Sequence, residues 1–476
     1  MNQNIQADKE MVDIAKYVIN YNISSSEAYK TARLCLMDSI GCAILALQFP
    51  ECKKLLGPII QETRVSNGSR VIGTPYILDP IRAAYNIGTL IRWLDFNDTW
   101  LAAEWGHPSD NLGAILAVSD HISRKNESEG LPPITVREVL ITMIKAYEIQ
   151  GIMALENSFN SHGLDHVILV KLASTAVAAK LLGCNEQQIV NAISNVWLDL
   201  GPLRTYRHWP NTGTRKSWAA GDATSRAVFL AFQAKKGEMG YPTALTAKDW
   251  GFYDKIWNGE KFILPQDYGN YVIENVLFKV SYPAEFHGQT AVEASIKLHA
   301  EVAKRLDDID KIEIYTQKAG NQIINKTGEL KNPADRDHCI QYMSAIGLIF
   351  GNLVAEDYEL KRARDPRINM LRNKMIVREN LEYTLEYYDP FKRSIANSLQ
   401  VFYTDGTHSD RIEVKYPLGH KKRRNEAIPL LELKFKNNLS AHFEESLIDE
   451  LLQLFQDEDQ LDNLPIHSLI DLLVRN

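Results

Sequence analysis

The chain has 476 residues and a formal net charge of -7 at pH 7, and 45% of its residues are hydrophobic and 24% charged. This length suggests roughly two to three domains, and the composition is typical of soluble globular proteins, so neither a disordered nor a fibrous protein is expected. The negative charge argues against nucleic acid as the main partner, which requires a basic surface, but a local cluster of lysine and arginine in a cleft could still bind a small anion.

The cysteines and the N-terminal residues indicate the cellular compartment in which we expect the protein. Five cysteines, Cys35, Cys42, Cys52, Cys184 and Cys339, show neither a CxxC pair nor the spacing of metal ligands. We therefore expect no disulfide framework, no zinc or iron-sulfur site, and a reducing compartment, the cytoplasm. The first ten residues resemble neither a secretory signal nor a transit peptide, and no apolar run reaches membrane-spanning length, so no membrane partner is expected.

Up to about residue 271 the sequence pattern predicts helices. Capping-box sequences, or a close imitation of one, stand at residues 24–27, 135–138 and 185–188. The small residues of 171–183 predict a central helix that its neighbours approach closely, and Gly183 is expected to end it.

Beyond about residue 275 the pattern changes. Residues 311–316 alternate as in a strand, and residues 398–417 predict two strands joined at Asp405-Gly406. Helical spacing returns at residues 447–455, and these last helices are expected to pack against the first ones. The predicted fold is therefore mostly α, with an inserted α+β domain.

The predicted boundaries follow from these changes of pattern. The large helical bundle domain comprises residues 1–272 and, after the insertion, residues 419–476. The smaller α+β domain comprises residues 273–418. Its junction with the helical part, residues 279–287, is a place where a cleft is expected, because binding sites occur preferentially between domains.

Residues 95–111 contain the densest group of titratable and hydroxyl side chains between two apolar segments. If a helix that begins near Ala83 extends to Asp95, then Asp95, Asp98 and Thr99 share one face of it. The sequence thus predicts a polar face directly after an apolar helix.

The second half of this stretch offers an acid or base. His107 precedes Pro108, which favours an extended backbone at the histidine, and an imidazole on such a loop suits proton transfer. The alternative is that Ser109 or Asp110 caps a helix over residues 112–123 and that His107 is a surface residue.

Two basic or histidine-containing segments follow. His162, Asp165 and His166 precede the small-residue helix, whose N-terminus favours anions, and a metal site made of the three is a minor alternative. The loop of residues 204–215 suits carboxylate binding, although an exposed basic loop explains its composition equally well. Its basic residues are Arg204, Arg207, His208 and Arg215. Residues 213–217 lack the glycine before the lysine and the leading strand of a phosphate loop, so nucleotide binding is rejected.

Several of these segments together resemble the MmgE/PrpD family. They are residues 92–99, His107-Pro108-Ser109, residues 163–166, Arg215-Lys216-Ser217, residues 279–287 and residues 337–342. They occur in family order over nearly the whole chain. The resemblance therefore does not rest on a single short motif. The stretch between Thr99 and His107 is longer here than in the decarboxylase members of the family, and His162 matches no motif position.

The resemblance implies a homodimeric, cofactor-free lyase in which an α+β lid, residues 273–418, closes over a large helical domain. The implied reaction is the dehydration of 2-methylcitrate to 2-methyl-cis-aconitate in propionate catabolism, with citrate as a further substrate and hydration as the reverse reaction. The partner would be a small tricarboxylate in the cytoplasm. Because the cysteines cannot build an iron-sulfur Lewis acid, acidic, basic and cationic side chains would have to carry the chemistry.

The resemblance also implies the site residues. The expected catalytic residues are Asp95, His107, His166, Lys279 and Tyr342, and the expected substrate-binding residues are Thr99, Ser109, Arg215, Lys216 and His287, with no metal. In this hypothesis the two histidines share proton transfer, and Asp95 orients one of them. Tyr342 or Lys279 protonates the leaving hydroxyl, although taken alone Tyr342 is more typical of a core or rim aromatic. Arg215 and Lys216 hold carboxylates.

Three alternatives stay open at this point. The chain could resemble cis-aconitate decarboxylase in activity, or it could be a non-catalytic protein that binds tricarboxylates. The presence of His107, His166, Lys216, Lys279 and Tyr342 argues against the second, since a decayed site would lose some of them. A metal-dependent hydratase is the third.

Overall fold

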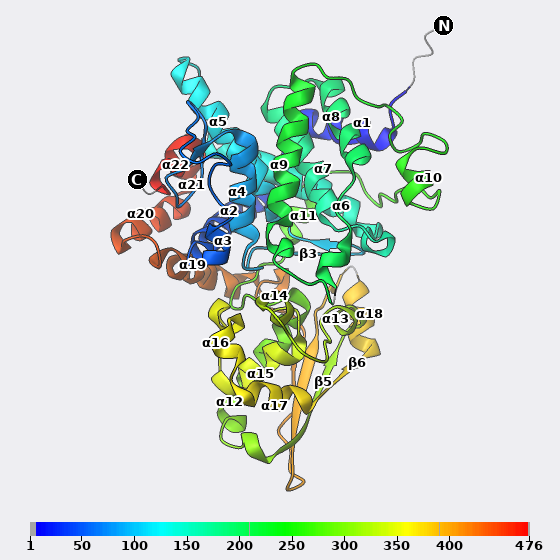
Figure 1. Cartoon of the computed structure of the whole chain (residues 1–476), viewed down its shortest axis with the longest axis vertical. Coiled ribbons are helices and arrows are strands. Elements are labelled where there is room, and N and C mark those ends of the chain that lie inside the picture. The colour runs from blue at the N-terminus through cyan, green and yellow to red at the C-terminus, as the bar shows by residue number, and fades with distance from the viewer. Residues whose placement is uncertain (1–5, 209, 390, 475–476) are drawn as a thin grey trace.

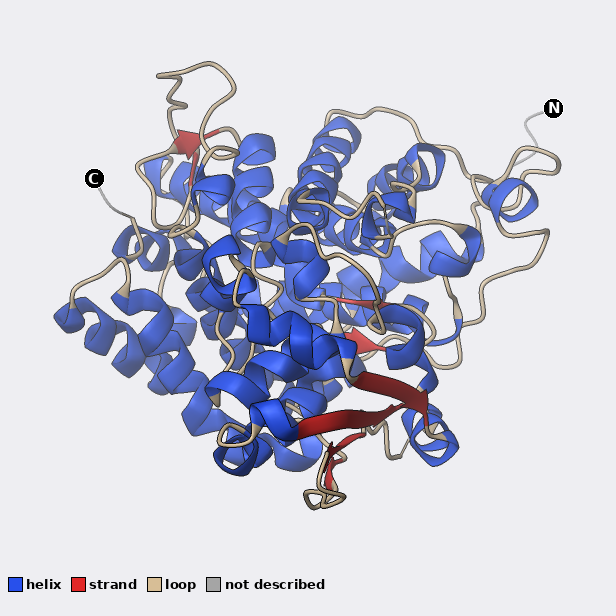
Figure 2. Ribbon diagram, turned by 60° about the horizontal axis from the view of Figure 1, so that its bottom comes forward, coloured by secondary structure: helices blue, strands red, loops and turns tan. Residues whose placement is uncertain are grey.

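The computed structural model describes residues 6–208, 210–389 and 391–474. Most of the chain is helical, and the longer strands form one small sheet (Figures 1 and 2). Two large hydrophobic cores organise it. No helix in the described part of the chain is long and apolar enough to span a membrane.

The larger core draws on both ends of the chain, because the C-terminal helices pack beside the N-terminal ones (Figure 1). Its N-terminal helices are α1 (Lys9–Asn20), α2 (Ser26–Ala46), α3 (Pro50–Lys53), α4 (Pro80–Arg92), α5 (Leu112–Ser128), α6 (Val136–Glu156), α7 (Val167–Leu181), α8 (Glu186–Asp199), α9 (Arg215–Lys235), α10 (Phe252–Ile256) and α11 (Tyr271–Asn275). Its C-terminal helices are α19 (Arg424–Ser440), α20 (Glu445–Gln456), α21 (Glu458–Asn463) and α22 (Ile466–Leu472). Two short antiparallel pairs accompany them, β1 (Ser69–Arg70) with β2 (Ile77–Leu78) and β3 (Trp100–Leu101) with β4 (Trp105–Gly106).

The smaller core lies within residues 284–414. Its helices are α12 (Gln289–Val302), α13 (Lys318–Ile323), α14 (Pro333–Arg336), α15 (Ile340–Phe350), α16 (Leu360–Ala363), α17 (Pro366–Asn373) and α18 (Leu381–Tyr388). Its sheet has the order β6-β5-β7-β8, from β5 (Ile309–Thr316), β6 (Met375–Glu379), β7 (Asn397–Tyr403) and β8 (Ile412–Val414). The β5–β6 pair is parallel and the other two pairs are antiparallel.

Local signals predicted several of these elements correctly. Thr135 and Asn185 form the expected capping boxes, and Gly183, with φ of +73°, follows α7 in the left-handed conformation that ends helices. The expected hairpin is β7–β8, with Gly406 at φ of +83°. The capping box predicted at residues 24–27 is wrong by one residue. The helix is capped by Ser25, whose hydroxyl accepts a hydrogen bond from the amide N–H of Ala28.

The helices α4 and α9, which carry site residues at their ends, pack against each other at two glycines, Gly88 and Gly221. A Cβ on Gly221 would lie 2.4 Å from the carbonyl oxygen of Tyr85, and one on Gly88 would lie 2.9 Å from the Cα of Gly221. Any side chain at either position would push the helices apart. The two glycines therefore fix the end of α4 relative to the start of α9. The domain boundaries at 272 and 418 stay a prediction.

Candidate active site

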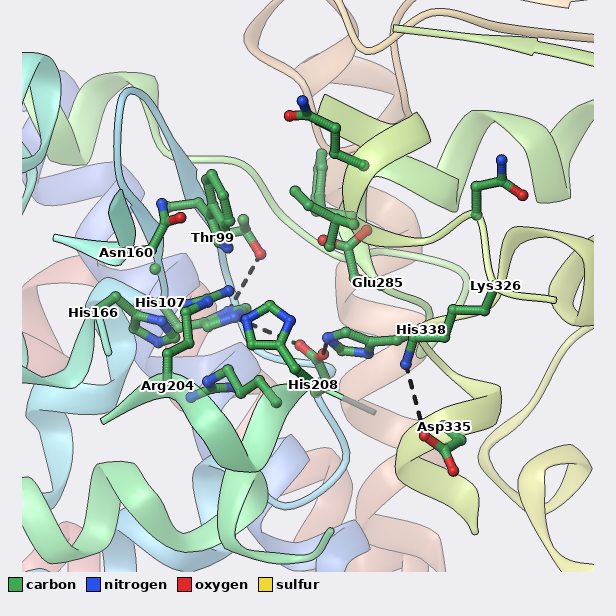
Figure 3. A pocket seen from close by; sticks show the side chains of 18 of the residues that line it. Thr99, His107, Asn160, His166, Arg204, His208, Glu285, Lys326, Asp335 and His338 are labelled. Atoms are coloured by element: carbon green, nitrogen blue, oxygen red, sulfur yellow. Dashed lines mark hydrogen bonds and ion pairs between the residues drawn. The ribbon is translucent and has the colours of Figure 1, made fainter. Parts of the chain in front are cut away.

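A cavity of about 740 Å³ lies between the two cores (Figure 3). Residues before position 273 contribute Arg92, Asp95, Thr99, His107, His166, Arg204, Arg207 and His208 to its wall. Residues after position 273 contribute Lys279, Glu285, Phe286, Lys326, Asp335 and His338. Of the residues expected at the site, Asp95, Thr99, His107, His166 and Lys279 are thus brought together here.

Asp95 is the centre of the charged side chains in this cavity. The helix α4 ends at Arg92, so the expectation that Asp95 lies in its last turns is wrong, and Asp95 has φ of +52°. Its carboxylate lies 2.8 Å from Nη1 of Arg92 and accepts a hydrogen bond from the ammonium of Lys279. That ammonium also donates to the carbonyl oxygen of Asp95 at 2.6 Å. Aspartate tolerates the left-handed region better than most residues, and such a conformation at a buried ion pair is typical of functional sites.

These contacts decide the charge of Asp95. Burial alone would raise the pKa of its carboxyl group, but the charges of Arg92 and Lys279, with help from Lys216, hold this pKa well below its usual value. Burial in turn lowers the pKa of the Lys279 ammonium, which Asp95 opposes. The pair is therefore ionised and buried. Removal of one partner would leave the other as an unpaired buried charge and would strongly destabilise the fold.

Asp98 faces away from the cavity. It accepts hydrogen bonds from the hydroxyl of Tyr147 at 2.6 Å and from the hydroxyl and amide of Ser109 at 2.7 and 3.0 Å. Ser109, expected to bind substrate, thus fastens the loop beneath the site and lies outside the described cavity wall. The shared face expected for Asp95 and Asp98 is wrong, because the chain turns at Asp95 where a helix would have continued.

His107 has the expected extended backbone, with φ of -126°. Its Nδ1 lies 2.7 Å from the carbonyl oxygen of Asp98 and 3.3 Å from Oγ1 of Thr99. The carbonyl can only accept, so this contact assigns the proton to Nδ1 and leaves the lone pair on Nε2, which lies 3.6 Å from Asp95. Burial, followed by the charge of Arg92, lowers the pKa of His107 well below its ordinary value. The imidazole is therefore neutral and can accept a proton.

His166 is the second imidazole, with its ring centroid 5.9 Å from that of His107. It is buried, and within the described part of the chain neither of its ring nitrogens has a hydrogen-bond partner. Burial lowers its pKa well below the ordinary value even though Asp165 opposes this. Buried polar atoms are nearly always paired, so these two nitrogens indicate a place where a bound molecule completes the site.

The minor alternative of a metal bound by His162, Asp165 and His166 finds no geometric support. Arg207 donates two hydrogen bonds to the carboxylate of Asp165. The ring of His162 stacks on Trp257 at 4.0 Å, and its Nδ1 donates to the carbonyl oxygen of Ile256 at 2.8 Å. The carboxylate and one imidazole are therefore already engaged, and the three side chains do not form a common ligand set.

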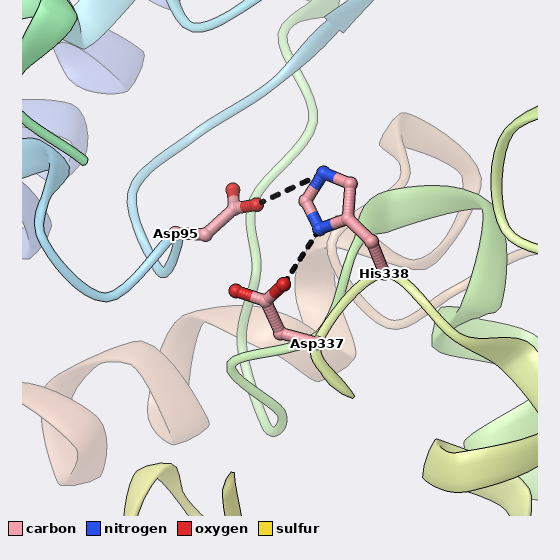
Figure 4. Close-up of side chains that lie close together, drawn as sticks. All are labelled: Asp95, Asp337 and His338. Carbon is pink, nitrogen blue, oxygen red and sulfur yellow. Dashed lines mark hydrogen bonds and ion pairs between the residues drawn. The ribbon is translucent and has the colours of Figure 1, made fainter. Parts of the chain in front are cut away.

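A different group joins the two cores (Figure 4). Lys216, at the start of α9, lies 2.7 Å from both carboxylate oxygens of Asp337, and Nδ1 of His338 lies 2.7 Å from one of them. Nε2 of His338 is 4.0 Å from Asp95. In the described part of the chain, Asp95, Asp337 and His338 are the one group of this kind whose possible metal-ligand atoms lie within 4.8 Å of one another. The ammonium of Lys216 already occupies the Asp337 carboxylate, so we interpret the group as an ion-pair network.

The basic loop divides into two parts. Arg204, Arg207 and His208 line the cavity, as the carboxylate-binding hypothesis expects. Arg204 lies 5.2 Å from the ring of Trp105, and its Nη1 has no hydrogen-bond partner among the described residues but lies 3.7 Å from Asp165 and 3.9 Å from Glu104. Arg215 instead pairs with Asp222 at 2.9 Å, outside the described cavity wall.

Two further expected site residues lie behind the cavity surface. The hydroxyl of Tyr342 donates to the carbonyl oxygen of Asp357 at 2.6 Å. His287 donates from Nδ1 to Glu285 at 2.8 Å, and its Nε2 lies 3.1 Å from the hydroxyl of Tyr387. Their roles stay predictions.

Sequence reasoning did not assign Arg92, Glu285 or His338, which all line the cavity. Each of them belongs to a segment that carries the family resemblance, so membership of such a segment was the available signal. Their orientation toward the cavity depends on tertiary contacts and had no local signal.

Comparisons with known proteins identify the family of the chain. Residues 12–264 match the MmgE/PrpD N-terminal domain and residues 282–458 match the MmgE/PrpD C-terminal domain. The chain is 57% identical over 470 residues to a protein of Escherichia coli (strain K12) named 2-methylcitrate dehydratase, covering 98% of this chain and 97% of that one. It is 56% identical over 468 residues to a protein of the same name from Cupriavidus necator, with the same coverage. It is 53% identical over 473 residues to the mitochondrial 2-methylcitrate dehydratase of Yarrowia lipolytica, covering 98% of this chain and 90% of that one. The chain belongs to the MmgE/PrpD family.

Proposed function

We propose that the chain is a hydro-lyase that dehydrates 2-methylcitrate to 2-methyl-cis-aconitate. The observation that carries this proposal is its 57% identity, over 98% of its length, to a protein named 2-methylcitrate dehydratase. The cavity suits that chemistry, because it places two neutral imidazoles among arginine and lysine side chains. The same observation favours dehydration over the decarboxylation and binding-only alternatives.

The substrate carries three carboxylates, and the cavity supplies cations for them. Nη1 of Arg204 makes no hydrogen bond among the described residues and only long ion pairs, at 3.7 Å to Asp165 and 3.9 Å to Glu104, so it receives one carboxylate. Arg92 and Lys279 both pair with Asp95. Arg215 was expected in this role, but its pairing with Asp222 assigns the contact to Arg204. Lys216 acts through the Asp337 carboxylate that it holds, and would reach the substrate only if that pair opened.

The first bond to break is a C–H bond beside a carboxylate. His107 takes this proton on Nε2, the nitrogen left free by the hydrogen bond to Asp98, and Asp95 stabilises the imidazolium that forms. Neither ring nitrogen of His166 has a hydrogen-bond partner among the described residues, although Nδ1 lies 3.5 Å from Asp165, so His166 accepts a hydrogen bond from the substrate or shares the proton. The cations around the carboxylate stabilise the charge that develops on it.

The electron pair of the C–H bond then forms the double bond, and the C–O bond breaks. The departing hydroxide needs a proton to leave as water. Lys279 and His338 lie on the cavity wall, and each carries an N–H proton that it can transfer. Tyr342 would take part only if its hydroxyl left the carbonyl of Asp357, and His287 acts through Glu285.

The proposal extends to architecture and setting. Residues 273–418 act as the lid, since their side chains Glu285, Lys326 and His338 close one side of the cavity. A cofactor-free, cytoplasmic homodimer that serves propionate catabolism is what the family resemblance supports. The five cysteines are free and buried at dispersed positions, a donor set that does not suit an iron-sulfur cluster.

The test is product analysis with metal-stripped protein. We expect 2-methylcitrate to give a product that absorbs in the ultraviolet, because dehydration forms an alkene conjugated with carboxylates, and mass spectrometry to identify it as methylaconitate. Citrate and cis-aconitate are run in parallel. Release of carbon dioxide from cis-aconitate without turnover of 2-methylcitrate would move the assignment to decarboxylation.

A further inference from the structure

One wall of the cavity is apolar, and the proposed acid-base chemistry does not use it. Leu101, Trp105, Phe286 and Ile323 all line the cavity and pack in one hydrophobic cluster, which we call the apolar wall. Leu101 and Trp105 are paired across the β3–β4 hairpin, whereas Ile323 ends α13 in the other part of the chain. None of the four can move a proton at neutral pH, so the wall contributes shape and hydrophobic contact.

Strand geometry places this wall beside the proposed base. Side chains alternate along a strand, so Thr99 and Leu101 share a face, at positions about 6.6 Å apart. The hydroxyl of Thr99 lies 3.3 Å from Nδ1 of His107. The indole N–H of Trp100 donates in the opposite direction, to the carbonyl oxygen of Gly151 at 3.2 Å. The Leu101 side chain therefore lies on the same face of the strand as the Thr99 hydroxyl, which contacts the proposed base.

The chemistry of the substrate indicates what occupies the wall. In 2-methylcitrate the carbon that loses its proton carries a methyl group, and citrate has hydrogen there. A carboxylate placed against Leu101 and Phe286 would lose its hydration without gaining a partner, so the three carboxylates belong with Arg92, Arg204 and Lys279. The methyl group is the one substituent of the substrate that gains from an apolar contact.

We propose that the apolar wall, and Leu101 in particular, binds the methyl group of 2-methylcitrate and makes the enzyme prefer this substrate to citrate. This inference rests on the proposed function and adds the determinant of its specificity. One extra methyl group in a hydrophobic pocket changes kcat/KM on the order of 10- to 200-fold, so a preference in that range is expected for the native chain.

The experiment compares kcat/KM for 2-methylcitrate with kcat/KM for citrate in each variant, because this ratio cancels losses of folded protein. For Leu101→Ala we expect the ratio to fall by about fourfold or more, the value of one buried methylene, with citrate turnover little changed. Leu101→Phe fills the same space and is expected to lower the ratio further by excluding the methyl group. Ile323→Ala tests the wall from the other part of the chain.

The matched control is Leu277→Ala. Leu277 belongs to the same hydrophobic cluster and is 7% exposed, against 8% for Leu101, but it lies outside the described cavity wall. Its ratio should equal that of the native chain even if the protein is less stable. Unchanged ratios in folded Leu101→Ala and Leu101→Phe, or an equal fall in Leu277→Ala, would overturn the inference. Absence of turnover of both substrates by the native chain would instead overturn the proposed function.

Discussion

Replacement of His107 with asparagine tests the assignment of the base most directly. The imidazole is held by the hydrogen bond from its Nδ1 to the carbonyl of Asp98 at 2.7 Å, and an asparagine amide can still donate to that carbonyl. The lone pair on Nε2 is lost, however. Removal of a general base costs about 10²- to 10⁴-fold in rate, which corresponds to about 3–5 kcal/mol in the activation barrier. We expect kcat/KM for 2-methylcitrate to fall by that factor.

The assay is the initial rate of alkene absorbance as a function of pH. Burial and Arg92 lower the pKa of His107 well below 6.5, so the neutral base persists as the pH falls through 6.5. The acid limb of kcat/KM for the native chain should therefore lie below pH 6.5, and His107→Asn should lose this limb.

The control is His162→Asn, which changes an imidazole that stacks on Trp257 outside the described cavity wall and has no role in proton transfer, and which should stay close to the native rate. A folded His107→Asn protein with kcat/KM within about tenfold of the native value would refute the reasoning, since a general base contributes more than that.

Three further predictions concern the network and the cofactor. Asp95→Asn should melt at a lower temperature than the native chain above about pH 4, and the difference should close at lower pH. The reason is that the folded-state pKa of Asp95 lies well below 3.8, so its ionised form stabilises the fold above the unfolded pKa and loses this effect as the pH falls through the folded one. Asp95→Ala should melt lower still, because alanine at φ of +52° adds about 1–2 kcal/mol of strain; equal melting temperatures would contradict this. His338→Asn should lower kcat more than Tyr342→Phe, because His338 lines the cavity and the Tyr342 hydroxyl is bound to a backbone carbonyl; the reverse order would return the acid role to Tyr342. Dialysis against a chelator should leave turnover unchanged, and activity that is lost and then restored by a divalent metal ion would show that a metal takes part.

Elements that depend on neighbouring residues were predictable. The capping boxes at Thr135 and Asn185 and the turn at Gly406 each need only a few residues in sequence, since a cap or a tight turn satisfies its own hydrogen bonds locally. The change from helical to alternating spacing near residue 275 likewise indicated a mostly helical fold with a small sheet. The residues of the cavity came mainly from the family resemblance, because residue types alone left each candidate with a structural alternative.

The tertiary structure decided how those residues are used. Asp95 is paired with Lys279, 184 positions along the chain, and Lys216 with Asp337, 121 positions along, and no local spacing encodes such contacts. Packing kept Tyr342 away from the cavity instead, since its hydroxyl donates to the backbone carbonyl of Asp357 in the smaller core. The sequence by itself thus determined the helices, the turns and the kinds of side chain available. Which of them face the cavity, and which charges pair in it, was decided by long-range packing, because burial selects partners by distance in space and not along the chain.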